Sequence, residues 1–240
     1  ALCYYKRKSI LTFIPKNACS TLRLSLALAN GILADESQHG FIHRNNHLFA
    51  ATVRDVCDCD FSFVILRSPY RRLASAFLDK FLSKDPMCEQ VIGFPRASEK
   101  FGLYTFMDFV DSLRDKNVLF SNSHWMRQIE FLLFEDYTEY FSVENMRHCK
   151  ARLKQLIDLD LVDARVLTNH GVENMEVIPM PGAHRMTIDA MSKMKQTGKV
   201  PSLGSLFTEK VIESVNETYA EDLELYESRI GAIEVPVACT

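Results

Sequence analysis

Two segments of the chain each combine an apolar run, a short loop and an amphipathic stretch. The first begins with Ser9–Ile14, a β-branched and aromatic run that predicts a buried strand. Pro15 ends this strand because proline cannot donate to a strand ladder. A loop over Pro15–Ser20 follows, and apolar residues among good helix formers then predict a helix from Thr21 to the stop signal Asn30-Gly31.

The second segment starts at Phe61–Leu66, which is almost entirely apolar, as expected for a central strand of a parallel sheet. Arg67 and Ser68 form its exit, and a helix is predicted from Pro69 onward. The apolar face of that helix consists of Leu73, Ala76, Phe77 and Phe81. Two strand–loop–helix units predict the α/β fold class, with a central parallel sheet between helices in one domain over residues 1–240.

The remainder of the chain is expected to be mainly helical. Long helices are predicted over Phe101–Arg114, Glu144–Ile157 and Thr208–Arg229. The aromatic-rich stretch Gln128–Tyr140 is expected to lead into a third strand that ends near Phe141. Val177–Pro181 is interpreted as a turn-rich break, and the polar stretch Lys193–Gly204 as a mobile loop.

Composition limits the classes of function. The 240 residues carry a net charge of −3, whereas a general nucleic-acid binder needs a dense positive surface. We therefore expect no nucleic-acid partner and a strictly local anion site. No stretch approaches the ~20 uninterrupted apolar residues of a membrane span. We expect a cytoplasmic protein, and the alternative is the Golgi lumen if an N-terminal anchor precedes Ala1.

The seven cysteines are an odd number without the repeated spacing of a disulfide framework. Reduced thiols are therefore expected. The pair Cys57 and Cys59 is one residue too close for the usual zinc or redox motif, and no second Cys/His pair lies at a suitable distance. The sequence predicts no metal site. It does not define the oligomeric state, so a homodimer is left as an open alternative.

The loop after the first strand has the features of an anion site. Backbone N–H groups at a helix N-terminus lack intrahelical partners, and the helix dipole favours negative charge there. Between Ile14 and Arg23 the chain adds the cation Lys16 and the hydroxyls of Ser20 and Thr21. The small side chains of Ala18, Cys19 and Ser20 let the backbone approach a phosphate. The pattern differs from the nucleotide-triphosphate loop, because the lysine comes early and glycine is absent.

These motifs resemble those of the sulfotransferases that use 3′-phosphoadenosine-5′-phosphosulfate (PAPS), and within them the carbohydrate branch with its chondroitin 4-sulfotransferase-like, HNK-1-like and bacterial members. The 5′-phosphosulfate loop of that family is similar to Pro15–Thr21, which we call the anion loop. Its 3′-phosphate element is similar to Val64–Phe77. The resemblance implies a P-loop-like sulfotransferase fold and PAPS as co-substrate, bound by Lys16, Asn17, Ala18, Cys19, Ser20, Thr21, Arg67 and Ser75.

Physical arguments assign roles to some of these residues. The ammonium of Lys16 is a mobile point charge that suits the oxygen bridging phosphate and sulfate as charge develops there. Arg67 follows a buried strand, where open α/β sheets bind ligands, and its planar fork matches a phosphate. Ser75 lies two turns into the next helix. It reaches the same phosphate only if the start of that helix lies beside the phosphate. Arg71 and Arg72 are expected to face solvent.

Transfer to an alcohol also requires a base, and histidine titrates near neutrality. In the carbohydrate branch such a residue often lies between the two PAPS motifs, where this chain has His39, His43 and His47. We favour His43, because the preceding Gly40–Ile42 is expected to be a short strand that holds it, and His47 is the second choice. A solvated loop position is the alternative for each.

The resemblance continues through Ser123–Gln128, which looks like the family's His-Trp segment, and to the last predicted helix. His47, His124 and Trp125 are candidates for binding the acceptor, a hydroxyl of a carbohydrate or small metabolite. A packing role is the alternative for Trp125. The rival functions are a nucleotide kinase-like phosphotransferase, which would want an acidic magnesium ligand at a strand end, and a non-catalytic nucleotide-binding protein.

Overall fold

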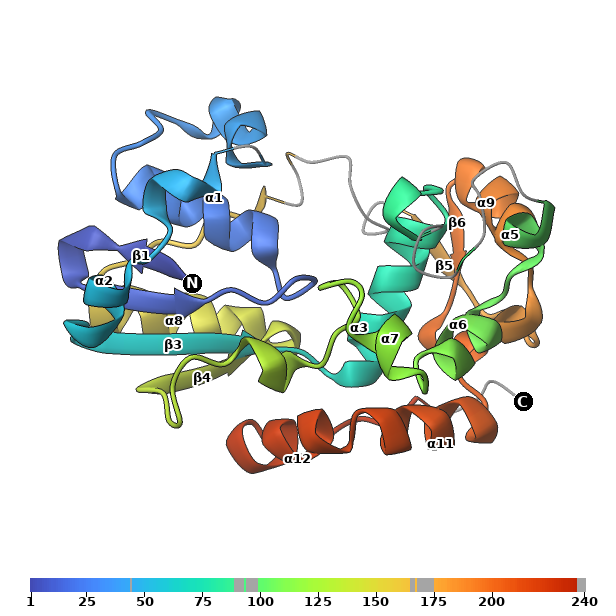
Figure 1. Cartoon of the computed structure of the whole chain (residues 1–240). Coiled ribbons are helices and arrows are strands. Elements are labelled where there is room, and N and C mark those ends of the chain that lie inside the picture. The colour runs from blue at the N-terminus through green and yellow to red at the C-terminus, as the bar shows by residue number, and fades with distance from the viewer. Residues whose placement is uncertain (44, 89–92, 94–98, 165–166, 168–174, 237–240) are drawn as a thin grey trace. The chain divides into compact units, whose positions relative to one another are not determined.

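The computed structural model describes residues 1–43, 45–88, 93, 99–164, 167 and 175–236 (Figure 1). The chain divides into two compact units. Unit 1 comprises Ala1–Arg67 and Gln128–Asn169, and unit 2 comprises Ser68–Arg127 and His170–Thr240. The fold class is α/β, as predicted, with a mostly parallel sheet and flanking helices.

Unit 1 contains the larger sheet. Its elements are β1 (Leu2–Tyr4), η1 (Tyr5–Arg7), β2 (Ser9–Thr12), α1 (Cys19–Ala29), η2 (Glu36–His43), η3 (Asn46–Phe49), α2 (Val53–Cys57), β3 (Phe61–Leu66), η5 (Gln128–Phe131), β4 (Glu139–Ser142), η6 (Val143–Asn145) and α8 (Met146–Ile157). Within the described residues the strand order is β1-β2-β3-β4, with β1 antiparallel and the others parallel. The predicted strands at Phe61–Leu66 and near Phe141 are confirmed.

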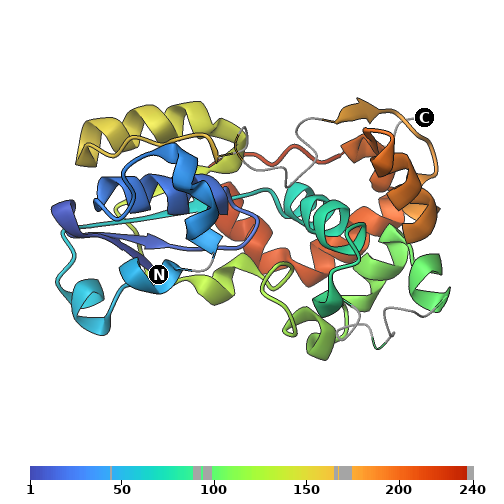
Figure 2. The ribbon, with the colours of Figure 1, turned by 90° about the horizontal axis from the view of Figure 1, so that it is seen from above.

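The core of unit 1 lies against one face of this sheet. Alternate residues of β3, Phe63 and Ile65, point into a buried cluster that also contains Leu24 of α1 and Leu153 of α8. Figure 2 shows both helices running along the direction of the strands. Because parallel strands end at the same edge of a sheet, the segments after β2 and β3 lie together at one edge.

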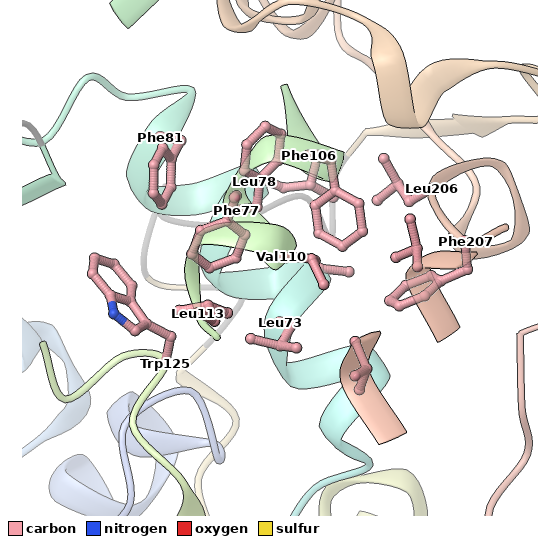
Figure 3. Packing of buried hydrophobic residues seen from close by; sticks show 14 of the residues in the cluster. Leu73, Phe77, Leu78, Phe81, Phe106, Val110, Leu113, Trp125, Leu206 and Phe207 are labelled. Atoms are coloured by element: carbon pink, nitrogen blue, oxygen red, sulfur yellow. The ribbon is translucent and has the colours of Figure 1, made fainter. Parts of the chain in front are cut away.

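Unit 2 is mainly helical. Its elements are α3 (Pro69–Ala76), the π-helix η4 (Phe77–Phe81), α5 (Glu99–Leu103), α6 (Phe106–Ser112), α7 (Lys116–Leu119), β5 (Glu176–Ile178), η8 (Ala183–Arg185), α9 (Ile188–Gln196), β6 (Lys199–Pro201), α10 (Leu203–Leu206), α11 (Glu209–Thr218) and α12 (Ala220–Arg229). Aromatic rings dominate its core, where Phe77 packs against Phe81 and Phe106 (Figure 3). Phe77 also stacks on Phe109.

Three expectations for unit 2 are wrong in detail. The stretch Lys193–Gly204 is not a loop, because α9, β6 and α10 occupy it and Val200 is buried. Val177–Pro181 begins with strand β5, whose residues pair in parallel with β6. The helix expected over Phe101–Arg114 is interrupted at Tyr104 and Thr105, since Thr105 caps α6 by accepting a hydrogen bond from the amide of Asp108.

Candidate active site

The anion loop has a left-handed backbone at two non-glycine residues. Lys16 has a φ of 72° and Ala18 a φ of 57°. Ala18 is the N-cap of α1, and no side chain caps the helix there. The first-turn amides of α1, which begins at Cys19, are therefore available to an anion, and alternation of the backbone hand forms a concave group of N–H donors. The described loop therefore combines two left-handed residues with an uncapped helix N-terminus.

Several loop side chains hold the loop in place. The thiol of Cys19 donates to the carbonyl of Ile14 at 3.0 Å, and burial raises its pKa. The hydroxyl of Thr21 accepts from the amide of Ala164 at 3.3 Å. Both residues are thus engaged in structural contacts, while the side chains of Lys16 and Ser20 are half-buried. Arg23 lies over the ring of Phe13, 4.3 Å from its centroid, and burial lowers its pKa.

Arg67 lies directly after β3, and its side chain reaches back to the anion loop. Its Nη1 donates to the carbonyl oxygen of Lys16 at 2.8 Å. Two motifs separated by about fifty positions therefore meet in unit 1, as the shared sheet edge predicts. The contact places a guanidinium next to the loop in which Lys16 supplies an ammonium. Two cationic residues therefore belong to the same edge of the sheet in a protein of net negative charge.

A buried pair of amides joins the same two segments. Asn17 and Gln128 are each 1% exposed. The Nδ2 of Asn17 donates to the carbonyl of Ile65 at 2.8 Å and to the Oε1 of Gln128 at 2.7 Å. Asn17 therefore anchors the loop to β3. We expected it to bind PAPS directly, whereas its side-chain N–H groups are directed toward the protein.

Ser75 belongs to unit 2. It lies on α3, which begins with Pro69 as predicted, and it is half-buried near the end of that helix. Lys16 and Arg67 belong to unit 1. A common role of Arg67 and Ser75 in binding one phosphate is a proposal.

The segment with the candidate bases is helical. Gly40–Ile42 was expected to be a strand, but Glu36–His43 form the 3-10 helix η2. Both η2 and η3 contact α1, and Ile42 and Phe49 are fully buried in the core of unit 1. The side chain of His43 lies outside the described part of the chain. His39 is half-buried and His47 is exposed.

Residues Ser123–Arg127 of the His-Trp segment belong to unit 2. Trp125 is fully buried, and its indole N–H donates to the carbonyl of Val118 at 2.9 Å. Its ring packs against Phe109 and against Phe81 (Figure 3). An aromatic side chain that is fully buried offers no face to a sugar, so the packing role describes Trp125. His124 is half-buried and its Nδ1 is 2.7 Å from the Oδ1 of Asn122.

Two residues make buried hydrogen bonds that the sequence patterns did not predict. Arg72 was expected to face solvent but is 1% exposed, and it donates to the carbonyls of Met126 and Ser123 at 2.6 and 3.1 Å. The position of Arg72 beside the apolar stripe of α3 did not indicate that its side chain is buried. Gln128 was noted only as part of the His-Trp segment, and nothing in its local pattern distinguishes it.

The part of the chain that the structure describes contains no group of three or more His, Cys, Asp or Glu side chains arranged to hold a metal ion. It contains no helix that is both long and apolar enough to cross a membrane.

The fold and the loop define an α/β protein in which an uncapped helix N-terminus follows a strand of a mostly parallel sheet. Comparison with known families identifies the class more closely, since the family model described as "Sulfotransferase family" matches residues 5–227. The chain belongs to this family. Searches of curated proteins and of solved structures found no match.

Proposed function

We propose that this protein transfers a sulfuryl group from PAPS to a hydroxyl acceptor, as in the carbohydrate branch of the family. The observation that carries the proposal is the anion loop, with left-handed Lys16 and Ala18 before an uncapped helix and with Arg67 at its side. Family membership favours sulfuryl over phosphoryl transfer. A kinase-like site would need an acidic magnesium ligand, and Arg67 stands at the strand end where one is expected.

The reaction is an in-line displacement at sulfur. The acceptor oxygen forms a bond to sulfur, the bond from sulfur to the bridging oxygen breaks, and 3′-phosphoadenosine-5′-phosphate leaves with that electron pair. In our proposal the amides of Cys19 and Ser20 and the ammonium of Lys16 stabilise the charge that develops on the bridging oxygen. Arg67 and Ser75 bind the 3′-phosphate, which fixes the nucleotide for attack.

The acceptor proton passes to a histidine between the two motifs, for which we propose His43. Its neighbour Ile42 is buried in the core of unit 1, and the helix η2 that ends at His43 contacts α1. These contacts fix the backbone of η2 and support the choice of His43. His47, on η3, is the second candidate, and His124 is proposed to contact the acceptor, a carbohydrate or small metabolite.

The decisive experiment is a calorimetric titration with 3′-phosphoadenosine-5′-phosphate, followed by an acceptor screen with radiolabelled PAPS in the presence of a magnesium chelator. We expect stoichiometric binding and transfer that does not need magnesium. Absence of nucleotide binding would overturn the proposal. Binding without transfer to any acceptor would instead identify a non-catalytic nucleotide-binding protein.

A further inference from the structure

The side chain of Gln128 is a buried polar group at the start of η5, and no step of the proposed reaction uses it. It is 1% exposed and lies in unit 1 next to the half-buried Arg67. A buried amide is costly unless its donors and acceptor are hydrogen-bonded. Its partners therefore indicate what it stabilises.

Gln128 pairs with both backbone groups of one residue. Its Oε1 accepts from the amide of Arg67 at 3.0 Å, and its Nε2 donates to the carbonyl of Arg67 at 2.9 Å. The β3–β4 ladder ends one residue earlier, at Leu66↔Ser142. The side-chain amide thus acts as one more rung, because it presents a donor and an acceptor side by side as a strand does. This contact fixes the backbone from which the Arg67 side chain projects.

The same oxygen also binds the anion loop. Oε1 of Gln128 accepts from Nδ2 of Asn17, which donates in addition to the carbonyl of Ile65. The β2–β3 ladder ends at Thr12↔Val64, so Asn17 takes over the pairing of β3 beyond the last residue of β2. Asn17 lies between the two left-handed residues of the loop, Lys16 and Ala18.

We propose that Gln128 is a positioning residue that sets the spacing between the anion loop and Arg67, and hence between the 5′- and 3′-phosphate sites. The inference rests on the proposed function. One amide is bonded to the backbone of Arg67 and to the loop residue after Lys16, and Arg67 itself donates to the carbonyl of Lys16. The loop and the arginine therefore form one rigid group within unit 1.

A fixed spacing matters only for a ligand that carries both phosphates. When two contacts of one ligand are held at the right span, the second forms at high effective concentration, and loosening the span removes that advantage. The test compares 3′-phosphoadenosine-5′-phosphate with AMP, which has the 5′-phosphate alone. The variant is Gln128→Met, which keeps the length of the side chain and removes the amide. Gln155→Met is the control, because Gln155 is exposed on α8.

We expect Gln128→Met to weaken binding of 3′-phosphoadenosine-5′-phosphate about tenfold or more and AMP by less than about threefold. Gln155→Met should leave both affinities unchanged. An equal loss for the two nucleotides would show a merely structural role and overturn the inference, as would no loss. If wild-type protein binds neither nucleotide, the proposed function fails instead.

Gln128→Glu provides a second measurement should the methionine variant not fold. The carboxylate still accepts from Asn17 and Arg67, but it faces the carbonyl of Arg67 without a proton to donate. Protonation restores the donor. The ratio of the two affinities should therefore approach the wild-type ratio as pH falls, whereas the wild-type protein and Gln155→Glu lack this recovery. A pH-independent ratio in Gln128→Glu would overturn the inference.

Discussion

Two residues of the anion loop have a backbone conformation that is unfavourable for most residues other than glycine. Lys16 and Ala18 both have positive φ, and the left-handed region costs an L-residue about 1 kcal/mol or more. Contacts of neighbouring residues offset this cost, notably those of Asn17 with Ile65 and Gln128. Strain of this kind gathers where a backbone must present its amides to a ligand.

Replacing Ala18 with glycine should relieve this strain. We expect Ala18→Gly to raise the free energy of unfolding by about 0.5–1 kcal/mol, because glycine adopts positive φ without a steric penalty. Urea denaturation provides the measurement. The control is Ala29→Gly, the same change at the last residue of α1, which should lower the free energy of unfolding by roughly 0.5–1 kcal/mol. Two changes of the same sign would contradict the argument.

His43 is the residue on which the proposed chemistry depends most directly. His43→Ala should lower kcat by about 10²–10⁴-fold, because the acceptor proton loses its base. The affinity for 3′-phosphoadenosine-5′-phosphate should stay the same, since the proposed base acts on the acceptor. His39→Ala and His47→Ala serve as controls, assayed by labelled sulfuryl transfer and calorimetry. Full activity of His43→Ala together with loss in His47→Ala would transfer the role to His47.

At the scale of elements, the sequence predicts best where hydrophobicity is continuous and local. Phe61–Leu66 is a strand because all but its first residue are buried, and Pro69 starts α3 as expected. Strands β5 and β6 were missed because three-residue strands carry no detectable period and their pairing is non-local. The short strand expected before His43 is a 3-10 helix, since Ile42 alone is fixed by burial there.

The helix α3 is held in place by Arg72, a residue that the amphipathic pattern of the helix assigned to the solvent-facing side. It joins α3 to the segment that precedes η5 by donating to Met126 and Ser123. Arg72→Met should lower the free energy of unfolding by about 2 kcal/mol or more, because two partly buried hydrogen bonds from a charged donor are lost.

Its neighbour provides a matched control. Arg71 is partly exposed and pairs with Glu234 at 2.7 Å, so Arg71→Met should cost less than about 1 kcal/mol. Denaturant midpoints of the two variants, measured side by side, test the contrast. Equal midpoints would refute a special role for Arg72.

For the whole molecule, the candidate site could be predicted from sequence only in part. The anion loop and Arg67 were predictable because each follows a strand of one parallel sheet, and parallel strands end at a common edge. The amide pair of Asn17 and Gln128 was not predictable, because its partners are backbone groups far away in the sequence. The family match over residues 5–227 establishes the class, while the acceptor depends on side chains that no shared motif specifies.

Buried thiols and phenols make the free energy of unfolding of the whole fold depend on pH in the alkaline range. Burial raises the pKa of Cys149 from 9.0 to about 12 and that of Tyr104 from 10.0 to about 12. Above the unfolded-state pKa, the unfolded chain releases protons that the folded chain retains. The unfolded state then binds fewer protons, so the free energy of unfolding must fall as pH rises from about 9 toward 12.

Cys149 allows this dependence to be measured at one site, because it is fully buried in the core of unit 1. Between about pH 8.5 and about pH 10.5 its thiol should account for a loss of roughly 2 kcal/mol. Cys149→Ala is less stable at neutral pH because it leaves a cavity, yet it should lose about 2 kcal/mol less than wild type over that interval. Cys57→Ala, at an exposed position, is the control and should follow the wild-type curve. If Cys149→Ala has the wild-type dependence in urea unfolding at the two pH values, then burial of this thiol does not contribute to alkaline instability.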